Sequence, residues 1–227
     1  MRPFHRIRID FSILILLTLL LAACGAKASY RYYTLTPVPS GLDGRSVDLG
    51  APRVVLGIGP VMIPDYLDRP QLVTRTSRNE LTLSEYNRWA GSFGSDALRV
   101  LEENLDTMLV ADGVTVVSWR RGVPNDFRVA VQISRFDVTE GEEAVLKAQW
   151  VIYGKDGKSV LLLRESDVRK PVRGFGYDSA VEAMGQALAD LSRDILQGVR
   201  LVRVSGFAGQ GGAGVMELRP ETDSPVP

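Results

Sequence analysis

Few side chains in this sequence could carry out covalent chemistry. The 227 residues contain one cysteine, Cys24, and one histidine, His5. Nucleophilic catalysis by serine or cysteine commonly needs a neighbouring histidine, and structural zinc sites need several cysteine or histidine ligands. Both residues lie near the N-terminus, one before an apolar run and the other directly after it. The processing of this segment therefore decides which chemistry the folded chain retains.

The first 23 residues have the order of a secretory signal. Three arginines in the first eight residues are followed by an apolar run, Phe11–Ala23, interrupted by one serine and one threonine. Small residues then precede Cys24, which is the arrangement of a cleavage site. The run is 13 residues long, shorter than the roughly 20 residues that span a bilayer as a helix. Cleavage is therefore favoured over a retained membrane helix.

Leu21-Ala22-Ala23-Cys24 resembles the lipobox of bacterial lipoproteins. There the cysteine is lipidated, with fatty acids such as palmitate, and becomes the first residue of the mature chain. An ordinary signal peptide cut at an Ala-x-Ala site is the alternative. Gly25 follows the cysteine instead of aspartate, so the resemblance implies the periplasmic face of the outer membrane. Cleavage would remove His5 and lipidation would cap Cys24, which excludes Ser-His, Cys-His and zinc chemistry as well as a disulfide.

The remaining chain gives no electrostatic reason to bind nucleic acid. Cleavage would leave 204 residues with 24 basic and 26 acidic groups, because the removed segment holds three arginines and one aspartate. Nucleic-acid affinity comes largely from neutralised phosphates. Gly209-x-Gly211-x-x-Gly214 has the spacing of a dinucleotide fingerprint but lacks the preceding strand and following helix. We therefore expect no nucleic acid, no cofactor and no metal ion.

Hydrophobic periodicity places strands and two long helices along the chain. Alternation in the strand at 144–153 puts four apolar residues on one face, Leu146, Ala148, Trp150 and Ile152. The second helix is expected to bury an apolar stripe of Val181, Met184, Leu188, Leu191 and Ile195. The helix at 95–110 is expected to have Ser95 as its N-cap, and the helix at 178–199 to start with a capping box of Ser179 and Glu182. A change of phase predicts a bulge near Ser134-Arg135, and Gly59-Pro60 is expected to end a strand. The expected strands are 32–35, 53–58, 71–76 paired with 80–83, 114–119, 128–134, 144–153 and 159–168.

This order of elements predicts an α+β fold. We expect a single domain with a mixed or antiparallel sheet and two main helices packed on one face. The expected boundaries are a lipoprotein signal peptide at 1–23, a lipidated tether at 24–31, the folded domain at 32–204 and a disordered Gly/Pro-rich tail at 205–227.

Two segments carry the residue types favoured at protein interfaces. One is the strand that begins near Arg69 and contains Gln71 and Arg75. The other, which contains Tyr86, Arg88 and Trp89, is too polar to be plain core. Tryptophan, tyrosine and arginine are enriched in binding hot spots. The alternative left open is that Trp89 packs onto the first helix and Arg88 forms a surface ion pair.

Several motifs in order resemble the PqiC/YmbA family. They are the lipobox, Tyr32-Tyr33-Thr34-Leu35, Ile58-Gly59-Pro60-Val61, the run from Tyr66 to Val73, and Leu101-Glu102-Glu103-Asn104-Leu105. The resemblance spans about Cys24 to Gly198. It implies a small α+β domain that is an ABC-type transport auxiliary lipoprotein. It also implies MCE-domain and membrane subunits as partners in moving lipids between membranes, with ring assembly in some members. Gly91-Ser92-Phe93-Gly94 departs from the family's more usual acidic-proline stretch.

The sequence thus predicts a non-enzymatic lipoprotein anchored to the outer membrane through Cys24. Its expected role is that of an auxiliary subunit of an intermembrane lipid transport system that supports envelope integrity. An envelope hydrolase using carboxylate or Ser-Lys chemistry is one alternative, and it predicts a concave pocket with buried, pKa-shifted groups. A lipoprotein that activates a cell-wall synthase is the other.

Overall fold

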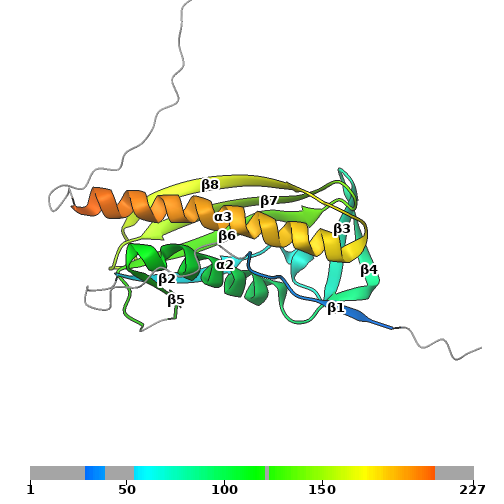
Figure 1. Ribbon diagram of the computed structural model, residues 1–227, viewed down its shortest axis with the longest axis horizontal. Coiled ribbons are helices and arrows are strands. Elements are labelled where there is room, and N and C mark those ends of the chain that lie inside the picture. The colour runs from blue at the N-terminus through cyan, green and yellow to red at the C-terminus, as the bar shows by residue number, and fades with distance from the viewer. Residues whose placement is uncertain (1–28, 39–53, 121–122, 208–227) are drawn as a thin grey trace, which may run out of the picture.

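The computed structural model of the chain describes residues 29–38, 54–120 and 123–207 (Figure 1). Cys24, its lipobox, the tether up to residue 28 and the tail from residue 208 lie outside the described residues. Eight strands, two long helices and two short 3-10 helices make up the described part. In chain order they are β1 Arg31–Tyr33, β2 Val54–Met62, η1 Asp65–Leu67, β3 Gln71–Ser77, β4 Glu80–Trp89, α2 Phe93–Leu109, η2 Val110–Asp112, β5 Val114–Ser118, β6 Phe127–Val138, β7 Glu143–Tyr153, β8 Val160–Pro171 and α3 Gly176–Phe207.

The strands form one mixed sheet that divides at β6. β6 pairs antiparallel with β7 along one edge, and β7 pairs antiparallel with β8. Along its other edge the first part of β6 pairs in parallel with β2, which in turn pairs in parallel with β5. The end of β6 meets β3 at Thr74 and Val138, and β3 continues into the β3–β4 hairpin and β1. The division creates an arm, β3–β4–β1, at one end of the domain.

The expected end of a strand at Gly59-Pro60 is wrong. β2 continues through these residues to Met62, and its pairing with β6 shifts register between Ile58 and Val61. Gly59 adopts a φ of 122°, which suits glycine. Because a bulge absorbs the one extra residue of β2, the glycine–proline pair does not end the strand. The predicted bulge in β6 is confirmed, since its pairing with β7 shifts register between Ile133 and Arg135.

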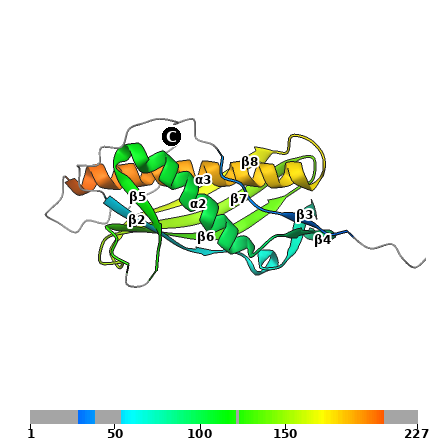
Figure 2. The ribbon, with the colours of Figure 1, turned by 60° about the horizontal axis from the view of Figure 1, so that its bottom comes forward.

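Both long helices cover the same face of the sheet (Figure 2), which confirms the predicted fold class. α2 packs on β2 and β5, α3 packs on β7 and β8, and the two helices contact each other. In β7, alternate residues point at α3 because strand side chains alternate between faces. These inward residues, Leu146, Ala148, Trp150 and Ile152, are the ones that the sequence pattern predicts.

The helix ends differ from the sequence prediction. α2 begins at Phe93 with Ser92 in the N-cap position, so the N-cap prediction at Ser95 is wrong. α3 begins at Gly176, and the Ser179 hydroxyl donates to the carbonyl of Phe175 instead of capping the helix. The capping-box prediction is therefore also wrong. α3 continues to Phe207, past both the expected helix end at residue 199 and the expected start of the tail at residue 205. Val202, beyond the expected helix end, is still buried against the core.

A polar chain of contacts fixes α3 to the sheet within the core. The Trp150 indole N–H donates to the Ser166 hydroxyl at 3.1 Å, and that hydroxyl donates to Asp194 of α3 at 2.7 Å. Gly198 lies over the same indole, and a Cβ placed on Gly198 would come within 2.6 Å of a Trp150 ring carbon. The absence of a side chain at Gly198 therefore allows α3 to pack closely on β7.

Candidate functional site

The first strand brings the start of the described chain against the end of β4. In the parallel β1–β4 pair, Tyr32 lies level with Arg88 and Tyr33 level with Trp89. Successive strand side chains point to opposite faces, so Tyr33 and Trp89 share the core side and Tyr32 and Arg88 share the outer side. The Tyr33 hydroxyl also donates to Oδ1 of Asn87 at 3.1 Å.

Trp89, a residue predicted to contact a partner, is a core residue. Its side chain is only 4% exposed. Its ring centroid lies 4.9 Å from that of Phe93 in α2, and Phe93 in turn lies 5.5 Å from Phe136 of β6. The structure thus has the arrangement that the sequence left as the alternative, with Trp89 packed onto the first helix. The side chain is not available to a partner at the surface.

Arg88 lies on the outer side of β4 and contacts an aromatic ring. Its guanidinium carbon is 4.3 Å from the ring centroid of Tyr30, and the Tyr30 ring lies 6.2 Å from that of Tyr86. Tyr30 and Tyr86 are both exposed. Within residues 29–38, 54–120 and 123–207 Arg88 makes no ion pair, so the predicted alternative of a surface ion pair is not found there.

Gln71 and Arg69 extend this outer surface onto β3. Gln71 is the register partner of Arg88, and Arg69 precedes it by two residues. Both are half-buried. Like Arg88, Arg69 makes no ion pair with another described residue. The structure therefore brings together four of the predicted contact residues, Arg69, Gln71, Tyr86 and Arg88, along the start of β3 and the end of β4.

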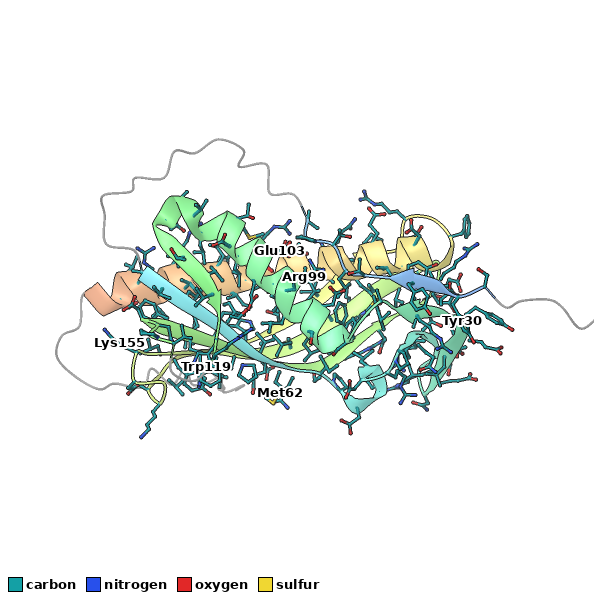
Figure 3. All side chains as sticks on the ribbon, turned by 90° about the horizontal axis from the view of Figure 1, so that it is seen from below. Tyr30, Met62, Arg99, Glu103, Trp119 and Lys155 are labelled. Atoms are coloured by element: carbon teal, nitrogen blue, oxygen red, sulfur yellow. The ribbon has the colours of Figure 1, made fainter. Side chains whose placement is uncertain are left out.

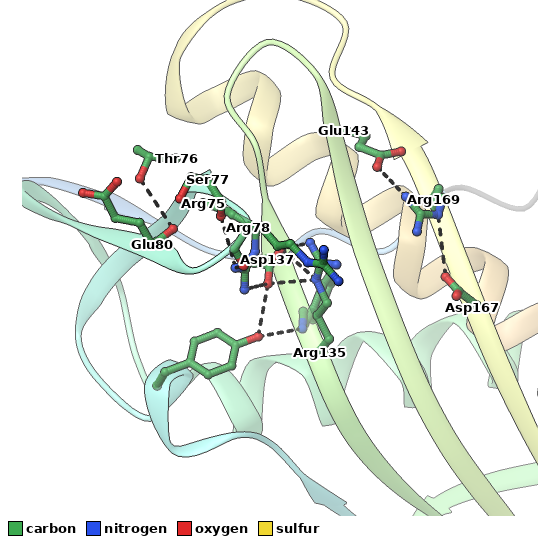
Figure 4. A network of polar contacts seen from close by, with 12 residues as sticks. Arg75, Thr76, Ser77, Arg78, Glu80, Arg135, Asp137, Glu143, Asp167 and Arg169 are labelled. Atoms are coloured by element: carbon green, nitrogen blue, oxygen red, sulfur yellow. Dashed lines mark hydrogen bonds and ion pairs between the residues drawn. The ribbon is translucent and has the colours of Figure 1, made fainter.

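Arg75, the remaining predicted contact residue, belongs to an ionic cluster beneath the surface (Figure 4). It donates to Oδ2 of Asp137 at 2.7 Å, and Arg135 donates to Oδ1 of the same carboxylate at 2.8 Å. Asp137 is 1% exposed. Arg75 also donates to the carbonyl of Arg78 at 2.9 Å. Its guanidinium joins β3 to β6 at the point where the sheet divides. Arg75 therefore stabilises the fold.

Two groups of this cluster, one buried and one half-buried, have a shifted pKa. Burial by itself would raise the pKa of Asp137, but hydrogen bonds from Arg75 and Arg135 outweigh it and lower that pKa below its usual 3.8. Tyr66 of η1 accepts the backbone N–H of Phe136 at 3.1 Å, and burial raises the pKa of its hydroxyl. Because each shifted group already has a partner, the cluster is a structural unit without a free acid or base.

A second polar contact holds the segment after β1 against α2. Asp96 accepts the backbone N–H of Leu35 at 2.6 Å and the hydroxyl of Thr34 at 3.0 Å. Arg99 donates to the carbonyl of Leu35 at 2.6 Å and to Glu103 at 2.9 Å, and these two helix residues are labelled in Figure 3. Leu35 itself is fully buried. The chain that enters from the tether is therefore fixed to the helix within a few residues.

The same end of the domain contains a shallow pocket of about 480 Å³. It lies where β1 and β4 approach the start of α3, and the rings of Tyr33 and Tyr177 face each other there at 6.4 Å. Its walls lack a carboxylate, a histidine or a lysine that could activate a hydroxyl as a nucleophile. They are formed by Ser29, Arg31, Tyr33, Tyr86, Asn87, Gly176 and Tyr177.

Two aromatic groups contain residues that are absent from the sequence predictions. The Arg128 guanidinium lies between two rings on the open face of the sheet, 4.6 Å from Trp119 and 4.5 Å from Tyr153. The other group gathers at the tether end, where Tyr30 meets Tyr86. The alternation of aromatic residues with arginine in Tyr30-Arg31-Tyr32 was the available signal for this second group.

The described ranges 29–38, 54–120 and 123–207 contain no cluster of three or more acidic, cysteine or histidine side chains that could hold a metal ion. Within the same ranges, no helix combines the length and apolarity required to cross a bilayer. Cys24 lies outside the described residues.

Residues 33–196 match the model of a family described as ABC-type transport auxiliary lipoprotein component. The chain belongs to this family. The match confirms the resemblance to the PqiC/YmbA family. Its description is that of a transport auxiliary component and not of an enzyme.

One relative is the intermembrane transport lipoprotein PqiC of Escherichia coli strain K12. It is 23% identical over 181 residues, which cover 79% of this chain and 92% of PqiC. A crystal structure of protein XCC0632 from Xanthomonas campestris superposes with a TM-score of 0.63 at 14% identity, covering 79% of this chain and 99% of that one. A crystal structure of an uncharacterized protein gives 0.62 at 21% identity, covering 75% and 99%. The folded domain of this chain therefore shares its fold with both of these structures.

Proposed function

We propose that this auxiliary lipoprotein is a subunit of an ABC/MCE-type intermembrane lipid transport system, anchored to the outer membrane through Cys24. The observation that carries the proposal is the family match over residues 33–196. It is supported by similarity along 92% of PqiC, which is named an intermembrane transport lipoprotein. MCE-domain and membrane subunits are the proposed partners, in support of envelope integrity, and ring assembly of the chain is part of the same proposal.

The proposed anchor keeps the domain close to the leaflet. Cys24 precedes Ser29, the first described residue, by five positions. Five residues reach at most about 18 Å when fully extended. The following segment is fixed to α2 through Asp96 and Arg99, so the domain has little freedom to move away from its lipid. A partner that crosses the periplasm would therefore meet this subunit at the outer membrane.

We propose that the partner contacts the outer surface formed by Arg69, Gln71 and Arg88. Arg69 and Arg88 make no ion pair with the other described residues, so both guanidinium groups are free to pair with carboxylates of a partner subunit. Arg75 and Trp89 do not belong to this surface, because one neutralises Asp137 and the other is buried. Arginine with a fixed orientation is a frequent interface anchor.

A role without catalysis is supported by the polar groups that the structure describes. The buried carboxylate of Asp137 is neutralised by two arginines. The pocket between β1, β4 and α3 is lined by tyrosines, an asparagine, a serine, a glycine and Arg31. An envelope hydrolase would instead place a free carboxylate or an activated serine in such a pocket.

The anchor is tested by labelling cells with radioactive palmitate and fractionating their membranes. We expect wild-type protein to carry label in the outer-membrane fraction and the Cys24→Ala variant to carry none. Label that persists in Cys24→Ala would refute the anchor assignment.

The partner is tested by purifying the lipoprotein from solubilised envelopes after crosslinking. We expect MCE-domain subunits to co-purify with wild type and to be lost in the double variant Arg69→Glu, Arg88→Glu. Arg164→Glu is the matched control, because Arg164 is exposed on β8 and makes no ion pair with a described residue. Recovery of cell-wall synthase subunits in place of MCE-domain subunits would contradict the transport role and favour synthase activation.

A further inference from the structure

The exposed aromatic residues of the described chain gather at one end of the domain. Phe175 is 94% exposed, and Tyr30, Tyr32 and Tyr86 are between 44% and 63% exposed. Among the residues whose side chains the structure describes, 29–38, 54–120 and 123–205, the other large apolar side chains with high exposure are not aromatic. Figure 3 shows Tyr30 at one end of the molecule and Lys155, in the β7–β8 turn, toward the other. We call these four residues the aromatic end.

Independent contacts bring the aromatic end together from three separate segments. Tyr30 lies against Tyr86 of β4 with ring centroids 6.2 Å apart. Tyr86 and Gly176 line the same pocket, which places the loop before α3 beside β4. Phe175 occupies that loop, immediately before Gly176. The four exposed rings therefore belong to one end of the domain even though they are far apart in sequence.

Phe175 is presented outward by its loop. It lies between Gly174 and Gly176, whose φ angles of 124° and 80° fall in the region that favours glycine. The two glycines allow a tight turn between β8 and α3 with a phenylalanine at its tip. A phenyl ring that is almost completely exposed costs free energy in water. Together with the three exposed tyrosines it forms an apolar group of the kind that contacts a partner or a membrane.

The position of the proposed anchor favours a membrane, and not a protein partner, as the surface that the aromatic end contacts. The chain leaves the described domain at Ser29, next to Tyr30, and Cys24 lies five residues earlier. That distance is at most about 18 Å. The aromatic end is therefore the part of the domain that the proposed anchor holds closest to the leaflet. The long helix α3 starts at this end and runs to the opposite end of the domain (Figure 1).

The chemistry of the aromatic end also fits a lipid interface. Tyrosine places an apolar ring and a polar hydroxyl at the level of the headgroups, and it is enriched where proteins meet the membrane surface. Arg31 and Arg173 lie in or next to the same segments and make no ion pair with another described residue. Their guanidinium groups are suited to phosphate oxygens. Phenylalanine provides the apolar group that enters the acyl boundary.

We propose that Tyr30, Tyr32, Tyr86 and Phe175 dock the domain on the phospholipid surface of the leaflet that holds its anchor, with α3 directed away from that surface. The proposal rests on the proposed lipid anchor. It reassigns Tyr86 from contact with a protein partner to contact with lipid. It also fixes the orientation of the domain, so that the end of the sheet near Lys155 faces the periplasm.

The test uses spin labels in the full-length lipidated protein. Lipidation would consume the chain's only cysteine, so Tyr32→Cys, Phe175→Cys and Leu201→Cys each introduce a single free thiol. Leu201 is an exposed α3 residue, and the 25 residues that separate it from Gly176 place it about 38 Å along the helix. The labelled variants are reconstituted in vesicles of phosphatidylethanolamine and phosphatidylglycerol. Power-saturation electron paramagnetic resonance then compares collisions with oxygen, which partitions into lipid, and with a water-soluble nickel complex.

We expect labels at positions 32 and 175 to favour oxygen over the nickel complex by severalfold relative to the label at position 201. Equal exposure of all three labels to nickel would overturn the proposal. Oxygen-favoured labels at all three positions would also overturn it, because the domain would then lie flat. Shielding of positions 32 and 175 from both reagents would overturn it as well and indicate contact with a second copy of the chain.

Wild-type protein treated with the same spin label distinguishes a failure of docking from an absence of lipidation at Cys24. With its cysteine lipidated, wild type takes up no spin label. If wild type is labelled at Cys24, the anchor assignment is refuted, and the docking proposal is overturned with it. If wild type stays unlabelled while positions 32 and 175 are open to nickel, only the docking proposal is overturned.

Discussion

Asp137→Asn is expected to destabilise the domain far more than loss of a surface aspartate. The Asp137 carboxylate is 1% exposed and is bound by Arg75 at 2.7 Å and by Arg135 at 2.8 Å. Asparagine keeps the size of the side chain but leaves two guanidinium groups at the division of the sheet without their counter-charge. Removing one partner from a buried charge cluster typically costs about 3 kcal/mol.

That loss translates into a measurable change in melting temperature. For a chain of this size each kcal/mol of stability corresponds to about 2–4 °C, so Tm should fall by roughly 6–12 °C in thermal unfolding followed by circular dichroism. The matched control is Asp167→Asn. Asp167 is a strand aspartate that is 49% exposed and pairs with Lys147 at 2.6 Å. Exposed pairs of this kind contribute about 1 kcal/mol or less.

The difference between wild type and Asp137→Asn should also depend on pH. The pKa of Asp137 is lowered in the folded state relative to its usual 3.8. The stabilisation is therefore present above 3.8 and is lost as pH falls through the lowered folded-state pKa. Urea unfolding at a series of pH values measures this. Equal Tm changes in the two variants, or a difference that does not shrink in acid, would show that the cluster is not what joins β3 to β6.

Two further changes follow from local geometry. Gly198→Ala should lower the unfolding free energy, measured by urea titration, by about 1–2 kcal/mol. A Cβ 2.6 Å from a Trp150 ring carbon overpacks the core, and this cost exceeds the roughly 1 kcal/mol by which alanine is favoured over glycine in a helix. An increase in the unfolding free energy would contradict the close packing of α3 on β7. The carboxyl of Asp156 should titrate by NMR at about 2, because the Ser159 hydroxyl and the backbone N–H groups of Lys158 and Ser159 lower its pKa. Ser159→Ala should raise that midpoint, and no change would show that the turn does not hold the carboxylate.

Much of the fold was predictable because its signals are local. Alternation in β7 and the helical stripe of α3 depend only on neighbouring residues, and they placed the inward side chains correctly. The bulge in β6 was visible as a change of phase after Ser134. Helix starts were less predictable. Ser95 and Ser179 are good N-caps by residue type, yet each helix begins two or three residues before its serine.

The contact residues show what periodicity cannot decide. Arg75 and Arg88 lie on adjacent strands and look alike in the sequence. One faces Asp137, which is 62 positions away in the chain, and the other lies over Tyr30. The sequence contained both residues but not the pairing of β3 with β6 or of β1 with β4. Strand pairing therefore decides that Arg75 forms an ion pair with a buried carboxylate and that Arg88 lies at the outer surface.

The sequence alone provided the lipobox-like motif that ends at Cys24, the family resemblance, the fold class and the residue types expected at an interface. Each of these depends on the order of nearby residues. The tertiary structure alone decided that Trp89 is buried, that Arg75 neutralises Asp137, and that Tyr30, Tyr86 and Phe175 share one end of the domain. These outcomes require β1, β4 and the loop before α3 to meet, and contacts between segments distant in the chain leave no local pattern in the sequence.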